Sequence, residues 1–393
     1  MSKQALIAGV GMIPFSKPGQ SAGYEDMAAD AIRRALEDAG LVLADVEQAV
    51  ASYIYGDSAS GQRCLFNVGA SDIPVFNVNN NCSSGSSAIY LARQAVESGQ
   101  VDCALAFGFE QMRPGALTAQ WDDRGHPADP LFGALKSIRP EAPEGPGALV
   151  LFGNAGFEYL EKYDASPELF AQVAVKTRAH AGRNPHALFK APLTVEEVMS
   201  ATTVYPPYLT RLMCCPPTCG AAAAIIVSPE FARRRQLSRL VRIAGQGMAT
   251  DTPATYDSAR DVVGQRMGRV AARKAYEAAG IGPEDVDVVE LHDCFTPNEV
   301  IAYEALGLCE EGGATRLVAA GDVTYGGRYV VNPSGGLMSK GHPIGATGLA
   351  QCNELVAQIR GEAGARQVDG ARVALQHNIG IPGGAVVTVY QGV

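Results

Sequence analysis

The segment AIRRALEDAGLVLADVEQAV, residues 31–50, decides the fold, because the chain contains a version of it twice. AARKAYEAAGIGPEDVDVVE, residues 271–290, aligns with it without a gap and shares eight of the twenty residues. Each copy has the pattern of an amphipathic helix that ends at a glycine, Gly40 or Gly280, followed by a short turn and an apolar strand. The repeat predicts two similar α/β halves, each with a mixed sheet.

A second pair of segments supports the same division. Cys82 opens the sequence CSSG and His342 opens HPIG, and the two residues are 260 positions apart. Apolar residues recur at helical spacing after each of them, and a strand-like run, residues 73–78, precedes Cys82. Cys82 and His342 are therefore expected at equivalent places, each at the N-terminus of a helix.

The stretch between the halves, residues 118–205, has prolines and glycines around 139–147 followed by helical segments, and it is predicted to be an inserted loop domain. The N-terminal half is then 1–117 with 206–236, and the C-terminal half is 237–393. The insertion carries cations that could meet phosphates, although a solvated helical face is the favoured interpretation for each: Lys162, Lys176, Arg178, Arg183 and Lys190.

Composition excludes several classes of protein. The chain has 393 residues, 47% of them apolar, and a formal charge of -9, which argues against a nucleic-acid or anionic-membrane surface. Nine cysteines without a dense framework indicate free thiols in a reducing compartment. The longest apolar run, residues 221–227, is far shorter than the roughly 20 residues that span a bilayer. Neither end shows a targeting signal, so cytoplasmic residence is expected.

Cys82 is the candidate nucleophile. A cysteine at a helix N-terminus has its thiolate stabilised by the helix dipole, so a lowered pKa is expected. His342 stands between glycines in SKGHPIGATG, and an imidazole there can take the proton of the cysteine.

Two further segments carry candidate groups. In LHDCFTP, alternation puts His292 and Cys294 on the same side of an extended chain, which suggests an acid/base cluster. In LQHNIG, Asn378 and Gly380 stand at the end of a predicted strand, where a free amide could hold an oxyanion. His377 is the next candidate if Cys294 is not the acid.

Two tempting motifs are discounted. Cys214, Cys215 and Cys219 lack a second pair at zinc-site spacing, so packing is the favoured role and no metal is expected. Gly9 and Gly11 follow a strand, but proline stands where a dinucleotide-binding loop needs its third glycine.

The motifs of the chain resemble those of a known family. The chain is similar over nearly its whole length to the thiolase superfamily, and within it to the sterol-carrier-protein x type. The resemblance implies a five-layered α/β/α/β/α fold, a loop domain that holds coenzyme A, and a homodimer or a dimer of dimers. It rests on the motifs NNNCSSGSSAIYLARQ, GFEQM, LVLFGNAG, LTRLMCCPP, GAAAAI, LHDCFTPNEV, SKGHPIGATGLAQC and QHNIG.

The chain departs from ordinary thiolases in two linked places. His292 in HDCF stands where they have the asparagine of NEAF, and Asn378 stands where they have a second cysteine. The resemblance then implies that Cys294 is the second thiol. Cys219 stands where relatives often have an aspartate, and the lipid-binding domain of sterol-carrier-protein x is expected to be missing.

The implied activity is transfer of an acyl group between a 3-oxoacyl-CoA and coenzyme A through a thioester on Cys82, in the degradative direction. Coenzyme A is then a co-substrate, and no bound cofactor is expected. The open alternatives are a decarboxylating ketosynthase, a thiolase-fold aldolase, and a non-catalytic paralogue that binds acyl-CoA or lipid.

Overall fold

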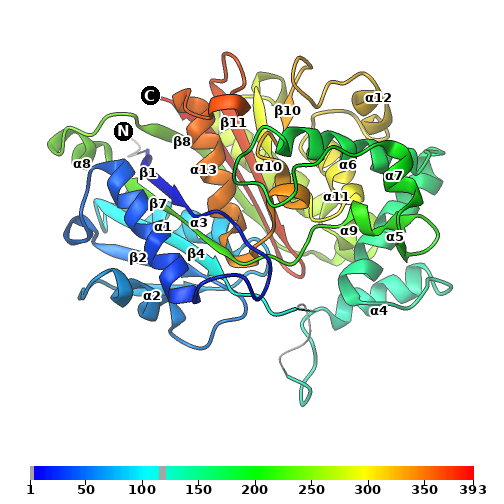
Figure 1. Cartoon of the computed structure of the whole chain (residues 1–393), viewed down its shortest axis with the longest axis horizontal. Helices are drawn as coiled ribbons and strands as arrows, with labels where there is room; N and C mark the ends of the chain where they lie inside the picture. Colours follow the sequence, from blue (N-terminus) through cyan, green and yellow to red (C-terminus); the bar gives the residue numbers. More distant parts are fainter. Residues whose placement is uncertain (1–3, 115–120) are drawn as a thin grey trace.

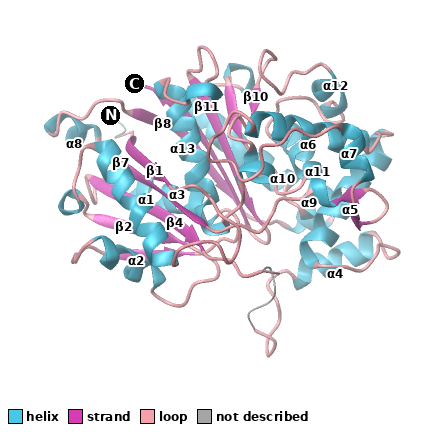
Figure 2. Cartoon of the chain, in the orientation of Figure 1, coloured by secondary structure: helices cyan, strands magenta, loops and turns pink. Residues whose placement is uncertain are grey.

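Ten strands form one sheet in the computed structural model, which describes residues 4–114 and 121–393 (Figure 2). In chain order they are β1 (Leu6–Met12), β2 (Gln48–Ser52), β3 (Val75–Val78), β4 (Cys103–Glu110), β7 (Gly220–Val227), β8 (Val241–Ala249), β9 (Val288–Glu290), β10 (Val330–Val331), β11 (Val373–Gly380) and β12 (Gly384–Gly392). Their order in the sheet is β10-β9-β11-β12-β8-β1-β7-β4-β2-β3. A separate hairpin pairs β5 (Thr203–Tyr205) with β6 (Leu209–Thr210).

The sheet consists of two halves with the same pairing pattern. In the order β3-β2-β4-β7-β1, the first two pairs are parallel and the last two antiparallel. The order β10-β9-β11-β12-β8 repeats this pattern. The halves meet where Leu6 of β1 pairs with Arg242 of β8. The predicted pair of equivalent α/β halves is confirmed.

The helices complete a layered arrangement (Figure 1). They are α1 (Tyr24–Ala39), α2 (Ser60–Val68), α3 (Ser84–Glu97), α4 (Asp129–Ile138), α5 (Gly147–Tyr163), α6 (Glu168–Ala181), α7 (Val195–Ser200), α8 (Pro229–Arg234), α9 (Ala259–Val262), α10 (Gln265–Ala279), α11 (Thr296–Ala305), α12 (Ala314–Ala319) and α13 (Thr347–Arg360). Helices α3 and α13 pack on each other between the two halves of the sheet. Helix α1 covers the outer face of the N-terminal half, and α10 covers that of the C-terminal half. The five layers are those expected.

The repeated segment folds twice into the same unit. Helix α1 ends at Gly40 with φ 67°, and α10 ends at Gly280 with φ 70°. Both values lie in the left-handed region that glycine adopts without strain. The predicted helix ends are therefore confirmed.

Paired glycines bring each outer helix close to its strand. A Cβ on Gly11 of β1 would lie 2.3 Å from the carbonyl oxygen of Ala31 in α1. A Cβ on Gly247 of β8 would lie 2.1 Å from the carbonyl oxygen of Ala271 in α10. Both glycines serve helix–sheet packing. Gly11 belongs to the motif that did not fit a dinucleotide-binding loop, and this packing is its role.

Helices α4 to α7 and strand β5 lie in the stretch predicted as an insertion, and β6, the other strand of the small hairpin, follows it directly. Helices α5 and α6 pack on α11 of the C-terminal half. The boundary expected at 117/118 falls in residues 115–120, outside the described residues, and the domain division stays a prediction. Within the described ranges, no helix combines the length and the apolar character needed to cross a membrane.

Candidate functional site

Cys82 lies in the tight turn that leads from β3 into α3. Asn81 adopts a left-handed conformation, φ 48°, and the backbone N–H of Asn80 donates to Oγ of Ser84 at 2.8 Å. The end of β11 packs directly against this turn, since a Cβ on Gly380 would lie 2.0 Å from the carbonyl oxygen of Asn80. Glycine is therefore required at 380, and the C-terminal half forms part of the nucleophile's surroundings.

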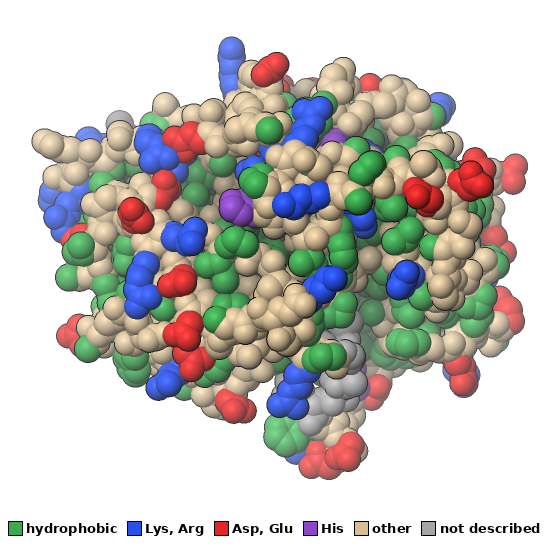
Figure 3. Space-filling model, in the orientation of Figure 1, with side chains coloured by type: hydrophobic (Ala, Val, Ile, Leu, Met, Phe, Trp, Pro, Cys, Tyr) green, Lys and Arg blue, Asp and Glu red, His purple; other side chains and the backbone are tan. Residues whose placement is uncertain are grey.

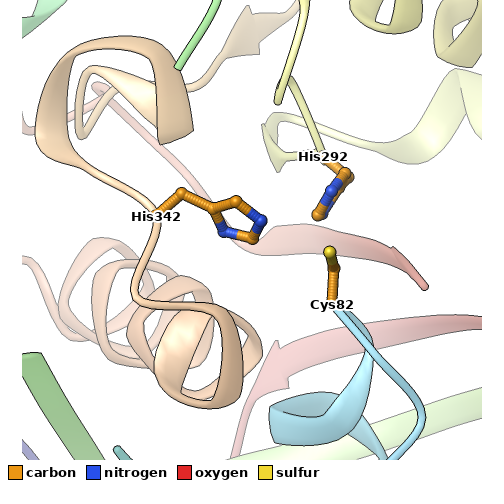
Figure 4. A group of neighbouring side chains, drawn as sticks. All are labelled: Cys82, His292 and His342. Atoms are coloured by element: carbon orange, nitrogen blue, oxygen red, sulfur yellow. The ribbon is translucent and has the colours of Figure 1, made fainter. Parts of the chain in front are cut away.

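Two imidazoles converge on Cys82 (Figure 4). One ligand-type atom of each of Cys82, His292 and His342 lies within 4.8 Å of the others. The imidazole rings lie with centroids 5.1 Å apart at an angle of 84°. His292 follows β9 and His342 precedes α13, so three distant segments build the group.

A cavity of about 240 Å³ opens onto this group. Cys82, Cys294, His292 and His342 line it together with Cys215. Most of the remaining lining is apolar and comes in part from the stretch predicted as an insertion: Phe132, Leu151, Phe152, Phe295, Ile344 and Ile379.

Hydrogen bonding assigns the proton of His342. The Thr347 hydroxyl donates to the carbonyl oxygen of Pro343 at 3.0 Å, and Oγ1 of Thr347 lies 2.6 Å from Nδ1 of His342. Both bonds form only if Nδ1 of His342 carries the hydrogen and donates it. The lone pair then lies on Nε2, where it can accept a proton.

His292 has the opposite arrangement. Nδ2 of Asn378 lies 2.9 Å from Nδ1 of His292, so the amide donates and the ring nitrogen accepts. The ring hydrogen of a neutral His292 must then be on Nε2. One imidazole therefore offers a lone pair and the other an N–H.

Burial keeps both rings neutral. It lowers the pKa of His342 to about 3 and the pKa of His292 well below its ordinary value of 6.5. The proximity of His342 lowers the pKa of His292 further.

The pKa of the Cys82 thiol differs from expectation. Burial, and then the nearby Glu110 carboxylate, raise its pKa to about 12, so the lowered pKa expected from the helix N-terminus is wrong in direction. The cost of removing a thiolate from water exceeds the lowering effect of the backbone hydrogen bond to the sulfur. Cys82 therefore rests as a neutral thiol that needs a base.

A network of buried ionisable groups connects the segments that carry both histidines. Glu290 accepts hydrogen bonds from the backbone N–H of Ser334 at 3.0 Å and forms an ion pair with Lys340 at 3.5 Å. Asp293 accepts from the backbone N–H of Leu337 at 2.7 Å. The segment that leads to His342 is thereby tied to the segment that carries His292.

Cys294 lies beside Cys215 in the cavity wall. The backbone N–H of Cys215 donates to the carbonyl oxygen of Cys294 at 2.9 Å. Burial raises the pKa of Cys294 well above its ordinary value, and the thiols of Cys215 and Cys82 raise it further. Cys294 is thus a neutral thiol close to both.

The sequence interpretation missed Cys215, which it assigned to packing. Alternation along an extended segment could have indicated that one member of the Cys214–Cys215 pair faces a cavity. Sγ of Cys214 lies 3.4 Å from the carbonyl oxygen of Thr210, and Sγ of Cys219 accepts from the backbone N–H of Met112 at 3.2 Å. Packing is the role of these two thiols.

His377 does not join the group. Because β11 alternates, His377 points to the face opposite Asn378, toward Gly268 of α10, and it does not line the cavity. Burial lowers its pKa to about 4. Neither ring nitrogen has a hydrogen-bond partner in the described part of the chain.

Cys82, His292 and His342 include the atom types that bind zinc. The tautomer assigned to His292 leaves this group one ligand short, because Nδ1 accepts from Asn378 and Nε2 carries the hydrogen. The arrangement suits proton transfer and anion binding better than metal binding, and the expected absence of a metal stays a prediction.

Comparison with known proteins gives consistent matches. Residues 5–205 match the family model described as "Thiolase, N-terminal domain", and residues 247–391 match "Thiolase C-terminal domain-like". Sterol carrier protein 2 of Oryctolagus cuniculus is 48% identical over 399 residues, which cover 99% of this chain and 72% of that protein. Acetyl-CoA acetyltransferase of Methanothermobacter thermautotrophicus is 36% identical and covers 92% of each chain. The solved structure named "Ltp2-ChsH2(DUF35) aldolase" superposes with TM-score 0.82 over 98% of each chain at 24% identity, a likeness of fold.

Proposed function

Since the chain belongs to the thiolase family, we propose that it transfers the acyl group of a 3-oxoacyl-CoA to coenzyme A through a thioester on Cys82. One observation carries the proposal. A neutral thiol faces a neutral imidazole lone pair and an imidazole N–H, with a second thiol, Cys294, in the same cavity wall.

The first half-reaction uses all four groups. Nε2 of His342 takes the proton of Cys82 as Sγ attacks the 3-oxo carbon. The bond between C2 and C3 then breaks, leaving the acyl group on Sγ and releasing an acetyl-CoA or propionyl-CoA enolate. The N–H on Nε2 of His292 stabilises the enolate oxygen, and Cys294 protonates the enolate carbon.

The second half-reaction returns the protons. The Cys294 thiolate takes the proton of the coenzyme A thiol, which attacks the thioester on Cys82. As the new acyl-CoA forms, the Cys82 thiolate regains its proton from His342. The backbone amides of Cys82 and Gly380 are the proposed donors to the oxyanion at the acyl carbon, since the two segments are in contact.

The apolar cavity is the proposed acyl site, and its opening toward Cys82 suits an uncharged chain. For the phosphates of coenzyme A, we propose Lys17 and Arg178, whose charged groups lie 5.4 and 5.0 Å from the ring centre of Phe189. Arg178 also donates to Oγ of Ser339, three residues before His342, at 3.0 Å. Figure 3 shows Lys and Arg side chains across the centre of one face. Lys162 and Lys176 instead form ion pairs with Glu311 and Glu299.

Degradative thiolysis is the proposed direction, because cleavage of a 3-oxoacyl-CoA is thermodynamically favoured. The ketosynthase alternative also accounts for Cys82, His292 and His342, but it gives no role to Cys294. The aldolase neighbour is similar in fold, and an aldolase does not need both thiols. A non-catalytic binding protein needs none of these groups.

Mass spectrometry of the intact protein tests the proposal. Incubation with a 3-oxoacyl-CoA should add one acyl mass to wild type, and Cys82→Ala should abolish this adduct and thiolysis while coenzyme A still binds. Cys294→Ala should still accept an acyl group from a simple thioester but lose thiolysis by about 10²–10⁴-fold, the usual contribution of a general acid or base. Cys309→Ala is the matched control, because Cys309 is a free thiol that does not line the cavity. An unacylated wild type, or normal thiolysis by Cys82→Ala, would refute the covalent route.

A further inference from the structure

We propose that Ser86 and Gln376, two buried side chains outside the cavity, determine which ring nitrogen of His292 carries its hydrogen. They act as positioning residues, through Asn378, and make His292 a hydrogen-bond donor rather than a second base. The assignment of a tautomer stands on the hydrogen bonds alone, whereas the catalytic consequence rests on the proposed function.

The chain of hydrogen bonds begins at a fixed amide. Nε2 of Gln376 donates to the carbonyl oxygen of Gly348 at 2.6 Å, and Oε1 accepts the hydroxyl of Tyr390 at 2.6 Å. A backbone carbonyl can only accept, so the amide of Gln376 has a single orientation that satisfies both bonds.

Ser86 passes this orientation on. The second hydrogen on Nε2 of Gln376 points to Oγ of Ser86 at 2.8 Å. Ser86 therefore accepts from Gln376, and its own single hydrogen is available for Oδ1 of Asn378, 2.9 Å away. The Ser86 hydroxyl thus accepts a hydrogen from Gln376 and donates its own hydrogen to Asn378.

Asn378 completes the chain. With Oδ1 facing the Ser86 hydroxyl, Nδ2 faces Nδ1 of His292 at 2.9 Å. Nδ1 must then accept, and the hydrogen of the neutral ring goes to Nε2. A flipped Asn378 would present its NH₂ group to Ser86, which already receives a hydrogen from Gln376, and the Ser86 hydroxyl would lose its acceptor.

Burial lets this series of hydrogen bonds determine the tautomer of His292. Ser86, Gln376 and Asn378 are each 0% exposed, so solvent does not replace a lost partner at their surface. Ser86 lies on α3 of the N-terminal half, while Gln376 and Asn378 lie on β11 of the C-terminal half. The donor role of His292 thus depends on contact between the halves, at the central helix layer.

Two variants change this series of hydrogen bonds at different points, and a third is the control. Asn378→Asp is nearly isosteric, but a carboxylate can only accept, so it should move the hydrogen of His292 to Nδ1. Ser86→Ala leaves Asn378 without its anchor and should give a mixture of the two tautomers. Thr177→Val is the matched control, because it removes a fully buried hydroxyl on α6 that takes no part in this chain.

Nitrogen-15 NMR of histidine-labelled protein reads the tautomer without substrate, and loss of one signal set in His292→Asn identifies the resonances among the six histidines. Wild type and Thr177→Val should show a protonated Nε2, and Asn378→Asp a protonated Nδ1. In steady-state thiolysis, Asn378→Asp should lower kcat by about 10²–10³-fold, the effect of losing one oxyanion donor, with KM unchanged. Ser86→Ala should show a smaller loss, again in kcat.

A protonated Nδ1 in wild type, or a Ser86→Ala protein with the wild-type tautomer, would overturn the assignment whatever the enzyme's reaction is. A shifted tautomer in Asn378→Asp with full kcat would overturn the donor role alone. Failure of wild type to catalyse thiolysis would instead refute the proposed function and leave the NMR result standing.

Discussion

Cys82 and His342 are both uncharged in the resting site, because burial raises the pKa of the thiol to about 12 and lowers that of the imidazole to about 3. An ion pair between them is therefore not the starting state. The proton moves only as the sulfur attacks, when the lone pair on Nε2 of His342 becomes useful. This differs from sites in which a cysteine is held as a thiolate.

The low pKa of His342 predicts an unusual pH profile. The acid limb of kcat/KM reports protonation of the base in the free enzyme, and burial moves it far below the ordinary 6.5. Thiolysis should therefore stay level from about pH 8 to about pH 5, the range in which an ordinary histidine would titrate. His342→Ala should lower kcat/KM by about 10²–10⁴-fold throughout. An acid limb with its midpoint near 6.5 would contradict the assignment, provided that activity returns fully after the enzyme is brought back to neutral pH.

At this scale the sequence indicated which residues meet but not their protonation. Cys82, His292, Cys294, His342, Asn378 and Gly380 come together as their motifs suggested, and their catalytic roles stay predictions. The direction of the Cys82 pKa was wrong, because a helix N-terminus is visible in a sequence and the burial around it is not. His377 was misplaced for a different reason, since neighbouring residues of a strand point to opposite faces and the motif did not reveal which face holds the site.

The paired glycines of β1 and β8 let the outer helix of each half approach its strand closely. Gly11→Ala and Gly247→Ala would place a methyl group within 2.3 and 2.1 Å of a helix carbonyl oxygen. Each should lower the free energy of unfolding by about 1–3 kcal/mol, the usual cost of overpacking, or more because backbone must move. Urea denaturation measures this loss.

Gly133 supplies the control for these substitutions. It lies within α4, and a Cβ there would meet no atom within 4 Å. Gly133→Ala should be neutral or stabilising by about 0.5–1 kcal/mol, because alanine favours a helix over glycine. Equal effects at positions 11, 133 and 247 would show that loss of chain freedom, and not close packing, is being measured.

The elements of the repeat were predictable because each carries a local signal. The ends of α1 and α10 follow from glycine, and the strands that follow them, β2 and β9, have apolar residues at 49–51 and 288–289. The joining of both halves into one sheet has no such signal, since it depends on a short pairing between β1 and β8, more than 230 residues apart. Long-range pairing of this kind is set by the packed whole and not by either strand.

Strand β3 leaves an edge of the sheet exposed, which suggests how two chains associate. It is the last strand in the sheet order, and Phe76 on it and Phe66 on α2 are 50% and 58% exposed. We expect a homodimer of this 41.1-kDa chain, formed through the β3 edge. Phe76→Lys should give monomers in light scattering, whereas Tyr256→Lys, another exposed aromatic position, should leave the dimer intact. A dimer that survives Phe76→Lys unchanged would place the interface elsewhere.

Buried ionisable groups also make the stability of the whole molecule depend on pH. His377 is one such group, and its contribution can be measured separately. Its pKa is lowered from 6.5 to about 4 by burial, so below 6.5 the unfolded chain binds a proton that the folded chain does not. The stabilisation associated with a neutral His377 is therefore fully present above 6.5 and is lost as the pH falls from 6.5 toward 4. Glu110 acts in the opposite sense, because burial raises its pKa from 4.5 to about 7 and its contribution is lost as the pH rises through that range.

His377→Leu removes a titrating group that does not line the cavity, so its effect on stability should change with pH. Relative to wild type, it should gain roughly 2 kcal/mol between about pH 6.5 and pH 5, at 1.36 kcal/mol for each pH unit. Part of its cost at neutral pH is offset because neither ring nitrogen of His377 has a hydrogen-bond partner in the described ranges. Urea denaturation at pH 7.5 and 5.0 measures the change, and Leu375→Ala on the same strand is the control, since its cost should be the same at both values. If the two variants show the same pH dependence, a partner or a bound proton must stabilise His377 in the folded protein.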